Sequence, residues 1–240
     1  MRSPDFKLEQ ALCTPSFDHW LGCDAFGRDL LHLTLSAAST SILFTLLALA
    51  LSYSLSLVFS SVTLALPQKS RGLLLHTLEF LLGFPSILLA LAVAAIRGPG
   101  IITLLISLSL GILPSLARLM ILRGIEVQTL PYYEAARALG ATAFRLVTRY
   151  DLPEILQLAK LKLPGYLAHT ILAEASLSFL GVGAPVGHET WGSLLAQGKD
   201  YLIEAPQIAW TTGTPLFLLI LWIQLKSEPI HRNSEVAPLK

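Results

Sequence analysis

Four residues near the start of the chain have side chains of a kind that binds metal ions. Cys13, His19, Cys23 and Asp24 are all residue types found at zinc sites. Their spacing fits none of the standard zinc patterns, so we expect no metal site here. Cys13 and Cys23 are the only cysteines, and one pair does not make the disulfide framework of a small secreted domain. We therefore expect both cysteines to be structurally dispensable.

The sequence carries no complete catalytic motif. His188 and Glu189 lack the second histidine that a zinc-protease helix supplies. Gly198 and Lys199 are followed by Asp200 and lack the upstream glycine of a nucleotide-binding loop. We therefore expect no enzymatic activity and no cofactor.

Two carboxylates, Glu79 and Glu174, fall inside strongly apolar stretches. A charged group at the centre of a membrane helix costs about 2.5–3.5 kcal/mol, so each should face the bundle interior, water or a positive partner. His76 lies one helical turn before Glu79 and is placed to pair with it. The two glutamates are candidates for a translocation path, and the alternative is structural anchoring at the membrane interface.

The elements that hold these residues are apolar and long. Hydrophobic residues make up 53% of the 240 residues and charged residues only 14%, against about 25% in a soluble domain. Membrane lipid leaves the backbone of an open strand unsatisfied, so the apolar stretches must be helices. We predict an all-α, polytopic membrane bundle of about five transmembrane helices, at residues 34–66, 73–96, 101–122, 163–182 and 208–225. Gly83 and Pro85 should bend the second.

A polar stripe runs along the first of these stretches. On an α-helix six hydroxyl residues fall within about 100° of one another, namely Ser41, Thr45, Ser52, Ser56, Ser60 and Thr63. Ser52, Ser56 and Ser60 are further candidates for the translocation path. In the alternative interpretation, the hydroxyls bond to backbone carbonyls and let helices pack closely.

Between the third and fourth apolar stretches lies a basic segment, residues 129–153, that predicts two short helices. Thr129 is placed to cap the first, with Pro131 in its first turn. Gly140 marks a turn between the two helices. Asp151 precedes Leu152 and Pro153 and is placed to cap the helix that returns to the membrane.

The placement of lysine and arginine predicts the orientation. Twelve of the 17 lie on the side of the bilayer that carries residues 129–153, and that side should be cytoplasmic. This divides the chain into an extracytoplasmic or interfacial segment, a membrane domain and a cytoplasmic tail, at residues 1–33, 34–225 and 226–240.

The segment also resembles the EAA loop of ABC-importer permeases, which docks on the ATPase subunit. The family pattern is Glu-Ala-Ala, three residues, glycine, nine residues, an aliphatic residue, one more, then Leu-Pro. Six residues fall in register with it and are the predicted ATPase-coupling residues, namely Glu134, Ala135, Ala136, Gly140, Leu152 and Pro153. Tyr150 stands where the family usually has the aliphatic residue.

Other motifs resemble one branch of that family, the dipeptide, oligopeptide and nickel permeases. They lie in the family's order at residues 21–29, 84–91, 174–183 and 190–192. The family usually has six membrane helices, and the one that normally precedes residues 21–29 is not visible here; the tail after the last helix also departs from the family pattern.

The resemblance implies a permease that imports di- or oligopeptides. Its partners would be a homologous permease, cytoplasmic ABC ATPases and an extracytoplasmic solute-binding protein. A nickel importer, or a truncated or accessory subunit that assembles without transporting, are the alternatives.

Overall fold

The computed structural model describes residues 10–183 and 187–227, in which the regular structure is helical. The first nine residues of the predicted amino-terminal segment and residues 228–240 of the predicted tail lie outside the described part. The elements are α1 (Leu30–Ala65), α2 (Gln68–Leu82), α3 (Ser86–Arg97), α4 (Ile101–Gln128), α5 (Pro131–Ala138), α6 (Ala143–Leu146), a π-helical turn (Val147–Asp151), α7 (Leu152–Phe179), α8 (Trp191–Gly198), a 3-10 turn (Lys199–Tyr201) and α9 (Gln207–Ser227).

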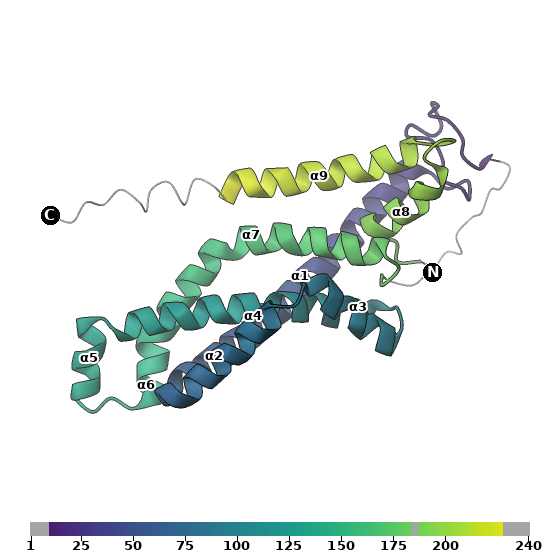
Figure 1. The fold of residues 1–240 in the computed structure, drawn as a ribbon. Coiled ribbons are helices and arrows are strands. Elements are labelled where there is room, and N and C mark those ends of the chain that lie inside the picture. Colours follow the sequence, from purple (N-terminus) through teal and green to yellow (C-terminus); the bar gives the residue numbers. More distant parts are fainter. Residues whose placement is uncertain (1–9, 184–186, 228–240) are drawn as a thin grey trace.

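The long helices form an elongated bundle with two distinct ends (Figure 1). The short helices α5 and α6 stand at one end, which we call the hairpin end. Helix α8 and the segment before α1 lie at the other, which we call the α8 end. The expected all-α class is thus confirmed.

Within the described residues, three helices are long and apolar enough to cross a membrane: α1, α4 and α9. Helices α2 and α3 taken together are also long and apolar enough, which brings the number to four if the pair is one span. Its helices meet at 83°, and the break contains Gly83 and Pro85, as the sequence predicts. Most of the predicted fourth crossing, residues 163–182, lies within α7, which is not among the helices that are long and apolar enough.

Helices α1 and α4 pack along much of their length and run in parallel. The direction follows from the contacts between them, since later residues of α1 meet later residues of α4 in a constant register. Near the hairpin end, Gly124 lets the helices approach so closely that an added Cβ would lie 2.2 Å from Leu64 Cδ1. The core beside this seam also takes in Ile155 and Ala159 of α7.

Much of the outer surface is apolar. On α1, Leu43, Leu47 and Val58 are each at least 48% exposed, and on α9 Phe217 and Trp222 are at least 60% exposed. A continuous apolar exterior suits contact with lipid rather than water.

Candidate functional site

The predicted coupling segment forms a helical hairpin at one end of the bundle (Figure 1). Pro131 occupies the first turn of α5, where its missing N–H costs no helical hydrogen bond. Thr129 does not cap this helix, contrary to the sequence prediction. It ends α4 instead, and its hydroxyl donates to the carbonyl of Glu126 at 2.7 Å. The N-cap position of α5 belongs to Leu130, one residue later.

Gly140 makes the turn between the two hairpin helices. Its φ of +84° lies in the left-handed region, which glycine adopts without the steric cost of a Cβ. The N–H of Ala141 bonds to the carbonyl of Ala136 and the N–H of Gly140 to that of Arg137, both at 3.1 Å. This pair of bonds is a Schellman motif, and it explains why glycine stands here.

Two large apolar side chains are exposed at the turn of the hairpin. Leu139 is 89% exposed and Phe144 78%, and both flank the Gly140 turn. Glu134 and Ala135 are exposed on α5, whereas Ala136 is half-buried. We call the exposed side chains of Leu139 and Phe144 the apolar tip.

The inner face of the hairpin anchors it to the bundle. Tyr133 and Leu146 are buried with Val127, the last buried residue of α4. Tyr150, the departure from the family pattern, stacks on Tyr132 with ring centroids 5.9 Å apart and meets Tyr133 edge-on at 6.0 Å. An aromatic residue therefore fills the place of the usual aliphatic one.

The hairpin returns to the bundle without a break in the helix. Helix α6 continues through the π-helical turn into α7, and Leu152 N–H bonds to the carbonyl of Val147, five residues earlier. Pro153 follows at once and has no N–H to give to Arg149, which favours such a widened turn. Leu152 is half-buried and Pro153 exposed. Asp151, predicted as a helix cap, makes no capping bond because the chain is already helical at this point.

Asp151 is fully buried and belongs to a polar network instead. Gln128 Nε2 donates to Asp151 Oδ2 at 3.0 Å, and Arg71 donates to Gln128 Oε1 at 2.8 Å. Burial raises the pKa of Asp151 to about 6, although the Gln128 bond and the Arg71 charge oppose the rise. Arg71 also donates to the carbonyl of Leu64 at the end of α1. The network thus joins α1, α2, α4 and the hairpin's return.

A second polar contact ties the hairpin's return to α4. Arg123 donates to Glu154 Oε2 at 2.5 Å and to Glu126 Oε2 at 2.8 Å. Glu154 stands in the first turn of α7, where its negative charge also suits the helix dipole.

The serine stripe of α1 lies in the seam with α4. Ser52, Ser56 and Ser60 are fully buried, and each hydroxyl oxygen lies 3.3 Å from a carbonyl oxygen of α4, those of Ser109, Leu113 and Ala117. The hydroxyls of Ser52 and Ser60 also donate to carbonyls within α1, at 2.8 and 2.6 Å. Ser109 donates back to α1, to the carbonyl of Ala48 at 3.2 Å. These contacts favour the packing interpretation; a place in the translocation path stays a prediction.

The two membrane carboxylates differ in environment. Glu79 is about half exposed and lies 3.3 Å from His76 Nδ1, the predicted local pair, and 3.5 Å from Arg118 of α4. Glu174 is fully buried in α7 and accepts a hydrogen bond from Ser178 at 2.7 Å. The structure therefore does not bring the two together, and their translocation roles stay predictions.

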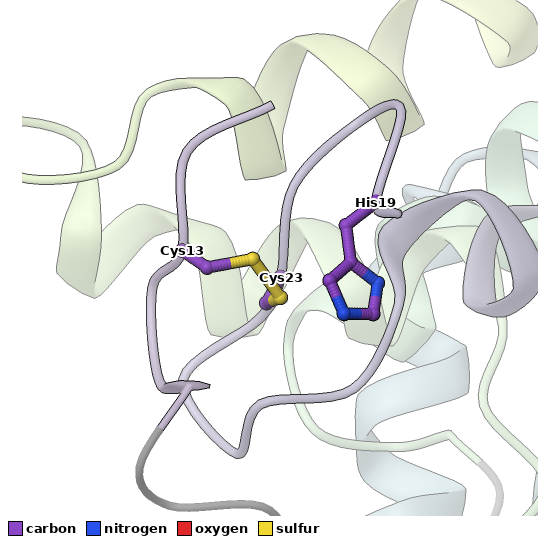
Figure 2. Close-up of side chains that lie close together, drawn as sticks. All are labelled: Cys13, His19 and Cys23. Carbon is purple, nitrogen blue, oxygen red and sulfur yellow. A yellow bond between two sulfur atoms is a disulfide. The ribbon is translucent and has the colours of Figure 1, made fainter. Parts of the chain in front are cut away.

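The structure pairs the two cysteines, which the sequence analysis did not predict. Cys13 and Cys23 form a disulfide that closes a loop before α1. Figure 2 shows His19 beside this bond, and the three side chains bring their ligand atoms within 4.8 Å of one another. The bonded sulfurs are not available as thiolates, the form that binds zinc. Pairing depends on how the chain folds back, which the spacing of two cysteines does not reveal.

A second feature that sequence reasoning missed is an ion pair across 161 residues. Arg28 donates to Asp24 and to Glu189, both at 2.7 Å, and so fixes the segment before α1 to the loop before α8. Burial works to raise the pKa of Glu189, but the hydrogen bond and charge of Arg28 outweigh it and leave that pKa below its usual value. We call this group the Arg28 clasp.

Helix α8 is fixed to α1 and α7 just behind the clasp. The backbone N–H of Trp191 donates to Ser41 Oγ at 3.0 Å, and its indole Nε1 donates to the Thr34 carbonyl at 3.2 Å. A Cβ added to Gly192 would lie 2.2 Å from the Ala175 carbonyl oxygen, so only glycine fits. The sequence motif at residues 190–192 therefore has a packing explanation.

A membrane bundle that presents a two-helix loop at one end has the fold of an ABC-transporter permease. The solved structure of the MetNI methionine ABC transporter contains a chain with TM-score 0.68, at 21% identity, over 85% of this chain and 96% of that one. A chain of an amino acid ABC transporter, solved with histidines, gives a TM-score of 0.63 at 16% identity, over 84% and 94%. These similarities concern the fold.

Sequence comparison gives the family. The chain belongs to the binding-protein-dependent transport system inner membrane components, whose family model matches residues 56–225. A putative peptide transport system permease protein of Brucella suis is 36% identical over 88% of this chain and 71% of its own. A glutathione transport system permease protein of Pectobacterium atrosepticum is 28% identical over 90% of this chain and 72% of its own.

The protein is therefore a multi-pass inner-membrane permease component of an ABC importer. Its relatives match the dipeptide and oligopeptide branch. The family implies an ATPase and a solute-binding protein as partners.

Proposed function

We propose that this chain imports di- or oligopeptides and that residues 129–153 couple closure of the ATPases to alternating access. The observation that carries the coupling role is the apolar tip. Leu139 and Phe144 stand almost fully exposed at the end of the bundle, next to Arg137 and Arg145. Exposed apolar side chains gain about 25 cal/mol for each Å² that a partner covers, so a tip of this kind is suited to docking.

The motif residues have distinct proposed roles within the hairpin. Glu134 and Ala135 form the docking side of α5, where the small Ala135 lets another backbone approach closely. Ala136 packs against the buried cluster of Val127, Tyr133 and Leu146 and lets α5 lie close to the bundle. Gly140 sets the angle between the helices through its left-handed backbone. Leu152 and Pro153 hold the widened turn that passes the hairpin's displacement into α7.

A continuous helix supports this coupling mechanism. Because α6, the π-helical turn and α7 form one helical path, a push on the tip is carried along this path into the membrane domain. The network of Arg71, Gln128 and Asp151 links the same point to α1, α2 and α4. A displacement of the hairpin is therefore passed to several membrane helices together.

The hairpin end is then cytoplasmic and the α8 end extracytoplasmic. This agrees with the lysine and arginine distribution. A disulfide between Cys13 and Cys23 agrees as well, because disulfides persist in oxidising compartments such as the periplasm. Residues 1–33 would face the solute-binding protein, residues 34–225 would pair with a homologous permease in the membrane, and residues 226–240 would lie in the cytoplasm.

The test is docking of the ATPase on the reconstituted transporter. Leu139→Asp and Glu134→Lys should each reduce co-purification of the ATPase and peptide uptake by at least about tenfold, since about 1.4 kcal/mol changes an affinity tenfold. Ile203→Asp is the matched control, because Ile203 is 98% exposed at the α8 end. It should leave ATPase binding unchanged.

Intact docking and uptake in both hairpin variants would overturn the coupling role. Intact docking of the wild-type chain with no peptide uptake would instead favour an accessory subunit, and uptake of nickel alone would favour the nickel importer.

A further inference from the structure

A cavity of about 500 Å³ lies between α4 and α7, close to the hairpin end. Four leucines line one part of it, namely Leu119, Leu122, Leu158 and Leu161. Leu122 is 47% exposed and Leu161 40%, so the cavity opens on the outer surface of the bundle. The rest of its lining is polar or charged. We call this space the α4–α7 cavity.

The lining changes from apolar to charged toward the hairpin. Helix α4 runs toward the hairpin, and along it Leu119 and Leu122 come before Arg123 and Glu126. Helix α7 runs away from the hairpin, and along it Glu154 comes before the two leucines of that helix. Both helices therefore place their charged side chains nearer the hairpin end and their leucines farther from it.

On α4 this change coincides with the expected edge of the membrane. The predicted apolar stretch within α4 covers residues 101–122, so Leu119 and Leu122 lie at the depth of lipid tails and Arg123 and Glu126 near the headgroups. An apolar space with a charged mouth matches the polarity of a phospholipid. Lipid tails are as apolar as leucine, so the leucines accept any acyl chain and selectivity has to come from the headgroup.

The charged mouth carries one positive and two negative side chains. Arg123 donates to Glu126 Oε2 at 2.8 Å and to Glu154 Oε2 at 2.5 Å. Among the described residues that line the cavity these three are the charged ones, and together they keep one net negative charge. The side chain of Glu126 is 64% exposed and that of Glu154 34%, so a ligand can reach both carboxylates.

A headgroup that fits this pattern has both a primary ammonium and a phosphate. An ammonium has three N–H donors, so it can bridge the two carboxylates and offset their excess charge. The guanidinium has five N–H donors, of which the glutamates use two, and its planar shape suits phosphate oxygens. A trimethylammonium has no N–H to donate, and a phosphate without an ammonium would meet the net negative charge. The pattern therefore favours an ethanolamine headgroup over choline or glycerol.

We propose that the α4–α7 cavity binds one molecule of phosphatidylethanolamine. Glu126 and Glu154 accept hydrogen bonds from its ammonium, Arg123 pairs with its phosphate, and the four leucines contact an acyl chain. The bound lipid adds a link between α4 and the first turn of α7, where the hairpin returns to the bundle. The inference depends on the placement of α4 in the membrane and is independent of the coupling role and of the transported solute.

The test is native mass spectrometry of the assembled, delipidated transporter with phosphatidylethanolamine, phosphatidylcholine and phosphatidylglycerol that share the same acyl chains. We expect phosphatidylethanolamine to bind roughly tenfold more tightly than either of the others, because only its ammonium donates hydrogen bonds to the carboxylates. The double variant Glu126→Gln, Glu154→Gln should bind it no better than phosphatidylcholine. The matched control is Asp200→Asn, Glu204→Gln, which removes two negative charges at exposed positions at the α8 end and should change nothing.

A second variant covers the case that the double variant does not fold. Glu126→Gln alone changes a largely exposed side chain and should lower the affinity for phosphatidylethanolamine by about threefold. Equal affinities for the three lipids, tightest binding of phosphatidylglycerol, or an affinity for phosphatidylethanolamine that neither substitution changes would overturn the proposal. A cavity covered by the homologous permease would give the last of these results.

Discussion

Gln128 at the end of α4 donates a hydrogen bond to the buried carboxylate of Asp151, with Nε2 and Oδ2 3.0 Å apart. The contact joins the point where the chain leaves the bundle for the hairpin to the point where it returns. Because Arg71 bonds to the same Gln128, any tilt of the hairpin has to rearrange this network or carry α2 along.

The buried position of Asp151 should make stability depend on pH. Its pKa is about 6 in the folded protein and 3.8 as the ordinary value, so between these values only the unfolded chain releases the proton. The contribution of Asp151 to the free energy of unfolding should therefore be largest below about pH 4 and should fall as the pH rises to about 6. Asp151→Asn removes this titration and should stabilise the protein at pH 7.5 by about 2 kcal/mol. Thermal unfolding midpoints in detergent from pH 5 to pH 8 test this, and parallel curves for the two proteins would contradict it.

The close approach of α8 to α7 predicts a strong effect of one methyl group. Gly192→Ala should destabilise the protein by about 1–3 kcal/mol, because the added carbon meets the Ala175 carbonyl and backbone has to move. Gly72→Ala is the matched control, since an added Cβ there meets no atom within 4 Å. Helix propensity alone would make that variant up to about 1 kcal/mol more stable. Equal unfolding midpoints for the two variants would show that the contact is not tight.

Substitutions in the serine stripe of α1 can distinguish a role in helix packing from a role in transport. Replacing Ser52, Ser56 and Ser60 together by alanine removes three hydroxyl contacts between α1 and α4, each worth up to about 0.6 kcal/mol. We expect the unfolding midpoint to fall while peptide uptake per folded transporter stays unchanged. Reduced uptake with an unchanged midpoint would instead assign the stripe to the translocation path.

The disulfide predicts a specific labelling pattern. In intact cells, a thiol reagent should add no mass to the wild-type chain before reduction and two groups after it, at Cys13 and Cys23. A reductant that cannot cross the membrane should suffice, because both cysteines are expected outside. If labelling required permeabilised cells, the cysteines would lie in the cytoplasm and the proposed orientation would be wrong. If labelling occurred without reductant, the two cysteines would not be paired.

The sequence alone was sufficient for features that local chemistry controls. Apolar runs locate the long helices, Gly83 and Pro85 locate the bend, and Gly140 locates the turn, because each depends on a few neighbouring residues. The helix caps were less reliable: Thr129 serves the helix before it, and Asp151 lies inside continuous helix. Both errors arise because a capping residue also fits other backbone positions, and tertiary packing decides among them.

Features built from distant parts of the chain were out of reach. The Arg28 clasp joins residues 161 positions apart, and nothing near Arg28 points to Glu189. The same holds for a cavity that Pro85 and Pro114 both line, since the two prolines are visible in the sequence but their proximity is not.

The parallel course of α1 and α4 settles how the sharply bent α2–α3 pair is to be counted. Two parallel membrane-spanning helices that follow one another in a chain must be joined by a segment that crosses back in the opposite direction. The connection therefore has to traverse the bilayer once in the opposite sense, bend included. If α2 and α3 formed a re-entrant segment that entered and left the membrane on the same side, α4 would run antiparallel to α1. The carbonyls of α4 would then meet the serines of α1 in reversed order.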